Sequence, residues 1–288
     1  MKNTLKKTNE ILKKYSITAN KRYGQNFLIN DNILEEIIYF SNINEEDLII
    51  EIGPGLGNLT EYLLEKTKYV LLIEIDKNMI QIINDRFKKC TNYKLINEDI
   101  LKINIDQEIK NIENENNIKF KNIKVVANLP YYITTPILFK LLQDESKINE
   151  IIVMVQKEVA TRMIAKHKNK DYGILSIMTQ YLSAPEIVVN VPNTSFIPAP
   201  NVESAVIKLK KEKKYTVKDE KLFYKLVHSS FATRRKKMIN SLINTHFLDM
   251  DKTKLEDLFN KCDINLNARA EELTIEQFIK ISDEIQKC

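Results

Sequence analysis

A glycine-rich turn and two acids at strand ends are the residues whose spacing first predicts chemistry. Three of the chain's five glycines lie in GPGLG at 53–57, directly after an apolar run. Such a turn between a strand and a helix lets the backbone approach a ligand at the C-terminal edge of a sheet. Glu74 and Asp99 end the next two strand patterns, where they can accept hydrogen bonds from ribose hydroxyls and from an adenine amino group. Gly53, Gly55, Glu74 and Asp99 therefore predict a site for an adenosine-containing ligand.

Two other interpretations of the glycine turn stay open at this point. A dinucleotide oxidoreductase needs its third glycine one residue later, and Asn58 stands at that position. A tight turn without any ligand is the structural alternative, although the two strand-end acids argue against it. S-adenosylmethionine carries a cationic sulfonium and needs no phosphate cradle, and Glu51 just before the turn is placed to favour that charge.

The sequence Asn128-Leu129-Pro130-Tyr131-Tyr132 follows a fourth strand pattern and predicts chemistry on an adenine amine. That amine is a poor nucleophile because its lone pair is delocalised into the ring. Two acceptors aimed at its protons, the Asn128 side-chain oxygen and the Leu129 carbonyl, would shift the nitrogen toward tetrahedral geometry. Pro130 stiffens the carbonyl before it, and Tyr131 offers an aromatic face for stacking on the base. We expect Tyr132 to pack beneath this loop.

Phe196 is the candidate for a second aromatic group that holds the base from the opposite side. It lies in SFIPAP at 195–200, where two prolines restrict the backbone of a loop. Exposed aromatic side chains on such loops stack on extruded bases. Ordinary packing within a hairpin is the alternative for this residue.

The elements that must position these residues alternate between strand and helix from residue 31 to 210. This order predicts an α/β fold with a mostly parallel sheet covered by helices on both faces. Two later strands, 186–191 and 202–209, are joined by a link too short for a crossover, so we expect them to be antiparallel. Residues 107–124 are polar and indicate a surface connection. The earlier strand patterns lie at 48–52, 70–75, 93–96, 124–127 and 150–155, and helical patterns at 32–40, 58–66 and 77–89.

The last quarter of the chain shows only helical spacing. Helical patterns recur around 219–230, 235–247, 251–261 and 274–286. We therefore expect two domains, residues 1–212 and residues 213–288, of which the second is small and all-helical.

Charge is concentrated in two basic segments of an otherwise acidic chain. The formal net charge of +5 combines +9 over residues 208–240, +6 over the first 22 residues and −10 over the remainder. This asymmetry is expected of a protein that contacts a polyanion through certain surfaces only. The alternative is that the lysines form an ordinary solvated face. No apolar run reaches the roughly 18 residues of a membrane helix, and the N-terminal segment lacks the apolar core of a secretory signal. We expect a cytoplasmic protein without membrane contact.

Metal and disulfide chemistry are not expected. The three cysteines, at 90, 262 and 288, lie far apart and form no CxxC pair. The three histidines show no spacing typical of metal ligands, so we assign none of them a function.

Further motifs accompany these residues along nearly the whole chain. KRYGQNFL at 21–28 precedes the glycine turn, and FIPAPNVESAVIKL at 196–209, SSFATRRKKMINSL at 229–242 and RAEELTIEQF at 269–278 follow NLPY. Together they resemble the small-subunit ribosomal RNA adenine dimethyltransferase family, the kasugamycin-sensitivity methyltransferases. The resemblance implies a class I (Rossmann-like) S-adenosylmethionine-dependent methyltransferase fold with a small helical C-terminal domain. It implies that residues 1–212 form the catalytic methyltransferase domain that binds S-adenosylmethionine, and that residues 213–288 bind RNA or the ribosome.

The resemblance also implies a reaction and its residues. The reaction is dimethylation of N6 of two adjacent adenosines in the 3′-terminal hairpin loop of 16S rRNA, within an assembling small ribosomal subunit. We expect a monomer with a role in small-subunit biogenesis. Asn26, Leu28, Gly53, Glu74, Asp99 and Asn128 would contact S-adenosylmethionine, and Lys21, Arg22, Arg234, Arg235, Lys236 and Lys237 become candidate RNA contacts.

Three alternatives to this function are considered. A large-subunit 23S rRNA adenine methyltransferase of the macrolide-resistance type usually has NIPY where this chain has NLPY, and its C-terminal sequence differs. A ribosome-assembly factor that acts mainly by binding would not need Asn128 and Tyr131 for chemistry. A small-molecule methyltransferase would usually lack the basic segments.

Overall fold

The chain folds into two compact units in this computed structural model, which describes residues 2–17, 25–233 and 235–287. One unit comprises Met1–Ala160 and Ala184–Lys211, and the other comprises Thr161–Ser183 and Glu212–Cys288. The second unit thus begins close to the expected boundary but also takes in residues 161–183. The physical reason is aromatic packing, because the Tyr181 ring lies 4.7 Å from that of Phe223 and its hydroxyl donates to Glu220 Oε1 at 3.1 Å.

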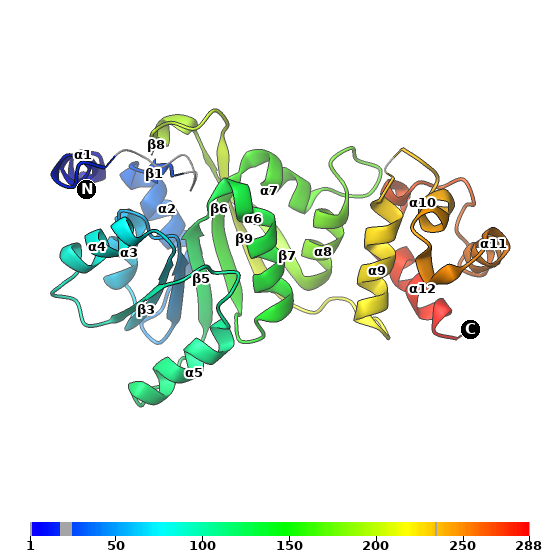
Figure 1. The fold of residues 1–288 in the computed structure, drawn as a ribbon, viewed down its shortest axis with the longest axis horizontal. Helices are drawn as coiled ribbons and strands as arrows, with labels where there is room; N and C mark the ends of the chain where they lie inside the picture. The colour runs from blue at the N-terminus through cyan, green and yellow to red at the C-terminus, as the bar shows by residue number, and fades with distance from the viewer. Residues whose placement is uncertain (1, 18–24, 234, 288) are drawn as a thin grey trace. The chain divides into compact units, whose positions relative to one another are not determined.

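A seven-stranded sheet forms the centre of the first unit (Figure 1). Its strands lie in the order β4-β3-β2-β5-β6-β9-β7. The first five in sequence, β2 to β6, pair in parallel, and β9 runs antiparallel to β6. All residues of β2 are buried, so helices cover both faces as expected. The strands are β2 (Leu48–Ile52), β3 (Tyr69–Glu74), β4 (Tyr93–Asn97), β5 (Ile123–Asn128), β6 (Glu150–Gln156), β7 (Ser183–Val191) and β9 (Ser204–Lys211).

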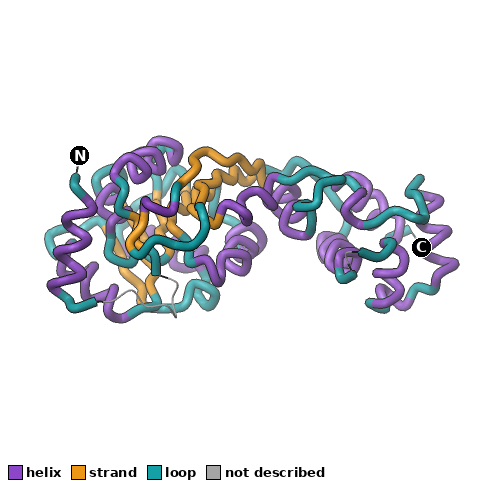
Figure 2. Tube along the Cα trace, turned by 90° about the horizontal axis from the view of Figure 1, so that it is seen from above, coloured by secondary structure: helices purple, strands orange, loops and turns teal. Residues whose placement is uncertain are grey.

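Helices begin where side chains cap the first turn. The side-chain oxygens of Asn30, Asp76 and Asn104 accept N–H groups of the turns that they precede. The helices of the first unit are α1 (Thr4–Lys14), α2 (Asp31–Ser41), α3 (Asn58–Leu64), α4 (Lys77–Arg86), α5 (Ile105–Glu115), α6 (Thr134–Phe139) and the start of α7 (Lys157–Ile164). Those of the second are α8 (Ile174–Leu182), α9 (Glu220–Phe231), α10 (Met238–Asn244), α11 (Lys252–Lys261) and α12 (Ile275–Ile285). Figure 2 shows that the strands belong to the first unit and that the second is helical.

One face of the sheet carries a hydrophobic core that also anchors a small two-stranded sheet. Leu34 of α2 and Leu63 of α3 pack in this core with Ile49 of β2. Leu28 and Phe196 belong to the same cluster. They lie in β1 (Phe27–Leu28) and β8 (Phe196–Ile197), which pair antiparallel, so this core fixes the N-terminal motif next to the sheet.

The interpretation of residues 107–124 as a surface connection is wrong for its first half. Helix α5 extends to Glu115, and its residues Ile105, Ile109 and Ile112 are buried. These isoleucines recur at helical spacing and form the buried side of the helix, while polar residues such as Gln107 and Lys110 are exposed. The abundance of asparagine hid this amphipathic pattern. None of the helices in the described ranges is long and apolar enough to cross a membrane.

Candidate active site

A cavity of about 360 Å³ lies where the parallel strands β2, β3, β4 and β5 end. Carboxyl ends of parallel strands meet at one edge of a sheet, which explains why residues far apart in sequence converge here. All predicted cofactor residues line this cavity, as do four of the five predicted catalytic residues. These are Asn26, Leu28, Gly53, Gly55, Glu74, Asp99, Asn128, Leu129, Pro130 and Tyr131.

The glycine turn after β2 depends on a backbone conformation that other residues rarely adopt. Gly53, Gly55 and Gly57 all have positive φ, at 65°, 54° and 80°. A Cβ at Gly57 would lie 2.7 Å from the Phe87 ring, so glycine there also lets α3 begin against α4. The turn therefore brings its backbone to the edge of the cavity.

Glu74 is held rigidly at the end of β3. Its Oε2 accepts the Gly55 N–H at 3.1 Å, and its Oε1 accepts the Asp76 N–H at 2.8 Å. Burial raises the pKa of this carboxyl. Each oxygen has a second lone pair, so the carboxylate can also accept hydrogen bonds from two ribose hydroxyls. This geometry fits the ribose of S-adenosylmethionine.

Asp99 lines the same cavity beside apolar side chains. Its Oδ1 accepts the Leu101 N–H at 2.9 Å, which fixes the carboxylate after β4. Ile75 and Leu101 line the cavity and keep 44% and 40% of their surface exposed. Exposed aliphatic groups beside a hydrogen-bond acceptor suit a planar adenine. Neither residue was predicted from the sequence, although each follows closely on a strand-end acid.

Glu51 does not carry the standing negative charge that the sequence led us to expect. It lines the cavity but is buried, and the Thr60 hydroxyl donates to its Oε2 at 2.6 Å. Burial raises the pKa of Glu51 to about 8. The carboxyl is thus mostly protonated at neutral pH, and a cationic group bound beside it would favour its ionised form.

Asn128, at the end of β5, is oriented by the N-terminal cofactor motif. Its Nδ2 donates to the Asn26 carbonyl at 3.2 Å, which presents Oδ1 as the acceptor of the amide. The next residue is fixed by β6, because the Leu129 N–H donates to the Met154 carbonyl at 3.1 Å. Pro130 follows with φ of −62°. These contacts hold both predicted acceptors of the adenine amine.

The two tyrosines of the motif differ in their surroundings. Tyr131 is half-buried, and its hydroxyl shares a 2.6 Å hydrogen bond with Oγ of the buried Ser204 in β9. Burial raises the pKa of the Tyr131 hydroxyl, so the phenol remains neutral. Tyr132 also lines the cavity and is 53% exposed. The expectation that Tyr132 packs beneath the loop is therefore wrong.

Phe196 is not the exposed stacking group that we expected. Only 3% of its surface is exposed, and its side chain packs in the core with Leu28. Strand β8 pairs with β1 and places Phe196 directly opposite Leu28. Because this pairing buries the ring, Phe196 supports the wall of the cavity from behind, and the hairpin-packing alternative describes it better.

The candidate RNA contacts are described only in part. Lys21, Arg22 and Arg234 lie outside the described residues. Arg235, Lys236 and Lys237 are exposed between α9 and α10 in the helical unit, and Lys237 Nζ donates to Asn267 Oδ1 at 2.5 Å. Arg235 and Lys236 therefore present cationic groups to solvent.

Comparison with known proteins decides the family. A model of the family described as ribosomal RNA adenine dimethylase matches residues 16–287. The chain belongs to this family. A ribosomal RNA small subunit methyltransferase A from Lachnoclostridium phytofermentans is 45% identical over 285 residues, which cover 98% of this chain and 97% of that protein. The protein of the same name from Alkaliphilus oremlandii is 43% identical over 284 residues, with coverage of 98% and 97%.

Two solved methyltransferase structures share the fold of this chain. A dimethyladenosine transferase from Plasmodium falciparum superposes with a TM-score of 0.74 at 28% identity, covering 91% of this chain and 98% of its own. The 23S rRNA methyltransferase ErmE has a TM-score of 0.64 at 20% identity, covering 91% of this chain and 100% of its own, and shows the fold alone. The expected class I methyltransferase fold is confirmed.

Membership in the ribosomal RNA adenine dimethylase family also confirms the expected chemistry. The chain is an rRNA adenine dimethyltransferase, and S-adenosylmethionine is its cofactor. The cavity fits that cofactor, because Glu74 and Asp99 provide acceptors and Ile75 and Leu101 provide apolar surface. Within the described ranges, no group of three or more His, Cys, Asp or Glu side chains is arranged to hold a metal ion.

Proposed function

We propose that this protein dimethylates N6 of two adjacent adenosines in the 3′-terminal hairpin loop of 16S rRNA, and that it acts during small-subunit biogenesis. Relatives at 43–45% identity over nearly the whole chain are named small-subunit methyltransferases. The observation that carries the chemistry is the Asn128 amide, oriented by the Asn26 carbonyl inside the cavity that Tyr131 also lines.

Each residue has a distinct task in this proposal. S-adenosylmethionine supplies an electrophilic methyl group. Asn128 Oδ1 and the Leu129 carbonyl accept hydrogen bonds from the adenine amine and expose its lone pair. Tyr131 stacks on the base, which has been extruded from its RNA stack. No strong general base is required, because the methylated amine is cationic and loses its proton readily.

Cofactor contacts are proposed for the other residues that line the cavity. Glu74 accepts from the ribose, Asp99 from the adenine amino group, and the backbone of Gly53 and Gly55 approaches the cofactor closely. Asn26 and Leu28 complete the wall from β1. Glu74 is the best test residue, because both its oxygens already have fixed partners that orient it.

RNA contacts are proposed for the basic segments. Arg235 and Lys236 are exposed and suited to phosphates, and we extend this role to Lys21, Arg22, Arg234 and Lys237 from their charge and their place in the family motifs. We further propose that the protein is a cytoplasmic monomer. Light scattering coupled to gel filtration measures its mass, and a dimer would contradict that part of the proposal.

Methylation of both ribosomal particles in parallel tests the substrate. Purified protein is incubated with labelled S-adenosylmethionine and with unmethylated small or large subunits, and the labelled bases are then mapped. We expect dimethylation of two adjacent adenosines in the small particle only. Label on one large-subunit adenosine would assign the chain to the 23S methyltransferases instead.

The variant Asn128→Ala separates catalysis from binding. We expect it to abolish methyl transfer while the protein still sediments with small subunits. Loss of both properties to the same extent would contradict a chemical role for Asn128. Wild-type protein that binds small subunits without labelling them would favour the assembly-factor alternative.

A further inference from the structure

Helix α1 packs directly on the two segments that carry the cofactor motifs. Its residues Ile11 and Leu12 lie against a buried cluster that contains Phe27 and Leu56. Phe27 belongs to β1, and Leu56 belongs to the glycine turn; both line the cofactor cavity. A helix outside the sheet thus contacts two walls of the cavity from behind.

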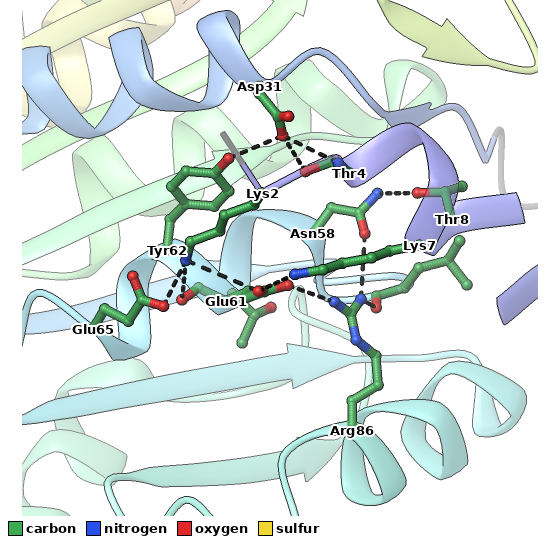
Figure 3. Close-up of polar contacts among 12 residues, drawn as sticks. Lys2, Thr4, Lys7, Thr8, Asp31, Asn58, Glu61, Tyr62, Glu65 and Arg86 are labelled. Atoms are coloured by element: carbon green, nitrogen blue, oxygen red, sulfur yellow. Dashed lines mark hydrogen bonds and ion pairs between the residues drawn. The ribbon is translucent and has the colours of Figure 1, made fainter. Parts of the chain in front are cut away.

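Asn58, at the start of α3, connects α1 with both walls (Figure 3). Its Nδ2 donates to the Leu28 carbonyl and to Thr8 Oγ1 of α1, both at 2.9 Å. Its Oδ1 accepts from Arg86 Nη1 at 3.2 Å. All polar atoms of this buried amide therefore have partners, and those partners come from three separate parts of the chain.

Arg86, at the end of α4, joins the glycine turn to the same network. Its Nη1 also donates to the Leu56 carbonyl, and its Nη2 donates to Glu61 Oε2 at 2.9 Å. Lys7 of α1 pairs with Oε1 of the same Glu61 at 2.6 Å. The Arg86 side chain is largely buried, so these charge-assisted hydrogen bonds are stronger than those of an exposed pair.

A second set of contacts holds the beginning of α1. Asp31 Oδ1 accepts from the Thr4 hydroxyl and from the Tyr62 hydroxyl, the latter at 3.0 Å. Lys2 pairs with Glu65 at 2.7 Å. The beginning of the helix is therefore fixed to the start of α2 and to the end of α3 (Figure 3).

We propose that α1 is a positioning element for the cofactor site, and that its docking is coupled to the binding of S-adenosylmethionine. The proposal rests on the assignment of the cavity as the cofactor site. The backbone carbonyls of Leu28 and Leu56 lie on segments far apart in sequence, and α1, Asn58 and Arg86 hold both. Fixing these walls before the cofactor arrives reduces the entropy that binding costs.

Thr8 and Arg86 are the residues to change, because neither lines the cavity. Thr8→Val keeps the shape of the side chain but removes the acceptor of Asn58, and Arg86→Met removes the guanidinium. Asn9→Ala, at an exposed position of the same helix, is the matched control. Titration calorimetry with S-adenosylmethionine is performed well below the melting temperature of each variant.

We expect Thr8→Val to raise the Kd for S-adenosylmethionine about fivefold, the effect of one lost hydrogen bond, and Arg86→Met to raise it further. Asn9→Ala should leave it unchanged. The KM for S-adenosylmethionine should rise in parallel, while kcat at saturating cofactor and the KM for the RNA substrate stay the same. A residue with a merely structural role would lower the melting temperature without this selective change.

Reciprocity supplies a second measurement on the full chain. If docked α1 favours the cofactor by some factor, then the cofactor must favour docking by the same factor. Hydrogen exchange of the α1 amides should therefore slow when S-adenosylhomocysteine saturates the protein, and Thr8→Val should reduce this protection. Unchanged exchange on saturation would overturn the coupling.

Glu74→Ala is the reference variant that separates the two proposals. Loss of affinity in Glu74→Ala alone, with Thr8→Val and Arg86→Met unaffected, would overturn the positioning role of α1 and leave the cofactor site intact. Unchanged affinity in all three variants would overturn the assignment of the cavity itself. Loss of affinity in all three, with the Asn9→Ala control unaffected, is the result that we expect.

Discussion

Glu51 carries a buried carboxyl whose ionisation opposes folding. Burial raises its pKa from about 4.5 to about 8, so the unfolded chain releases this proton at lower pH than the folded protein does. Its contribution to stability is complete below pH 4.5 and is lost progressively up to pH 8. Within that window Glu51 should lower the free energy of unfolding by about 1.4 kcal/mol for each pH unit. Glu51→Gln should remove this pH dependence, because the amide does not ionise.

Urea unfolding at several pH values measures this effect. The variant should gain stability relative to wild type as the pH rises from 5 to 8, and the difference should level off above pH 8. Parallel curves across this range would show that Glu51 titrates at its ordinary value.

Tyr131 and Ser204 form the hydrogen bond that sets the tilt of the proposed stacking ring. Tyr131→Phe and Ser204→Ala each remove this bond and should lower kcat/KM for the RNA about fivefold, with the Kd for S-adenosylmethionine unchanged. Because both substitutions break one contact, the double variant should lose no more than either single variant. Additive losses in steady-state methylation assays would show that the two residues act independently.

The start of helix α3 depends on glycine for two separate reasons. Gly57 has φ of 80°, and a Cβ there would lie 2.7 Å from Phe87 and 2.9 Å from Ile83. Gly57→Ala should therefore lower the free energy of unfolding by about 2–4 kcal/mol, through backbone strain and overpacking together. Thermal or urea unfolding measures this change.

Two other glycines are controls for this element. Gly53→Ala faces only the positive φ, since its Cβ would lie 3.9 Å from Pro130, and should cost about 1–2 kcal/mol. At Gly173 a Cβ meets nothing within 4 Å, so Gly173→Ala should change stability by less than about 0.5 kcal/mol. Equal costs at positions 53 and 57 would refute the steric part of the argument.

For the molecule as a whole, charge on the helical unit should govern RNA affinity. Arg235→Glu combined with Lys236→Glu should weaken RNA binding and reduce the slope of log K against log salt by roughly 1–2, since each phosphate contact contributes about 0.7–0.9. Fluorescence anisotropy at several salt concentrations measures the slope.

A control variant with two other lysines of the same unit replaced has the same change in net charge. Lys280 and Lys287 are paired with Asp263 and Glu284 at 2.7 and 2.6 Å, and replacing both by Glu alters the net charge by the same amount. This control variant should keep the salt slope of wild type. Identical slopes for the two double variants would assign the effect to net charge instead of a specific surface.

The sequence predicted the sheet and most of the site for one physical reason. Buried parallel strands require apolar, β-branched runs, which makes them visible, and the polar residues that end such strands must converge at one edge. Glu74, Asp99 and Asn128 were found in this way. Helix α5 was missed because its three buried isoleucines are separated by polar residues.

Other properties of the site depend on contacts between distant segments, which only the tertiary structure shows. Phe196 is buried because β8 pairs with β1, whereas Tyr132 is exposed at the cavity, and no local pattern distinguishes the two aromatic residues. The pKa of Glu51 is raised because residues packed around the carboxyl exclude solvent from it. Asn58 stands where a dinucleotide-binding motif has its third glycine. Its structural role follows from its hydrogen bonds to residues 8, 28 and 86, which are remote in sequence. Local sequence thus determined which residues lie at strand ends, and packing between remote segments determined which side chains are exposed, charged or held in place.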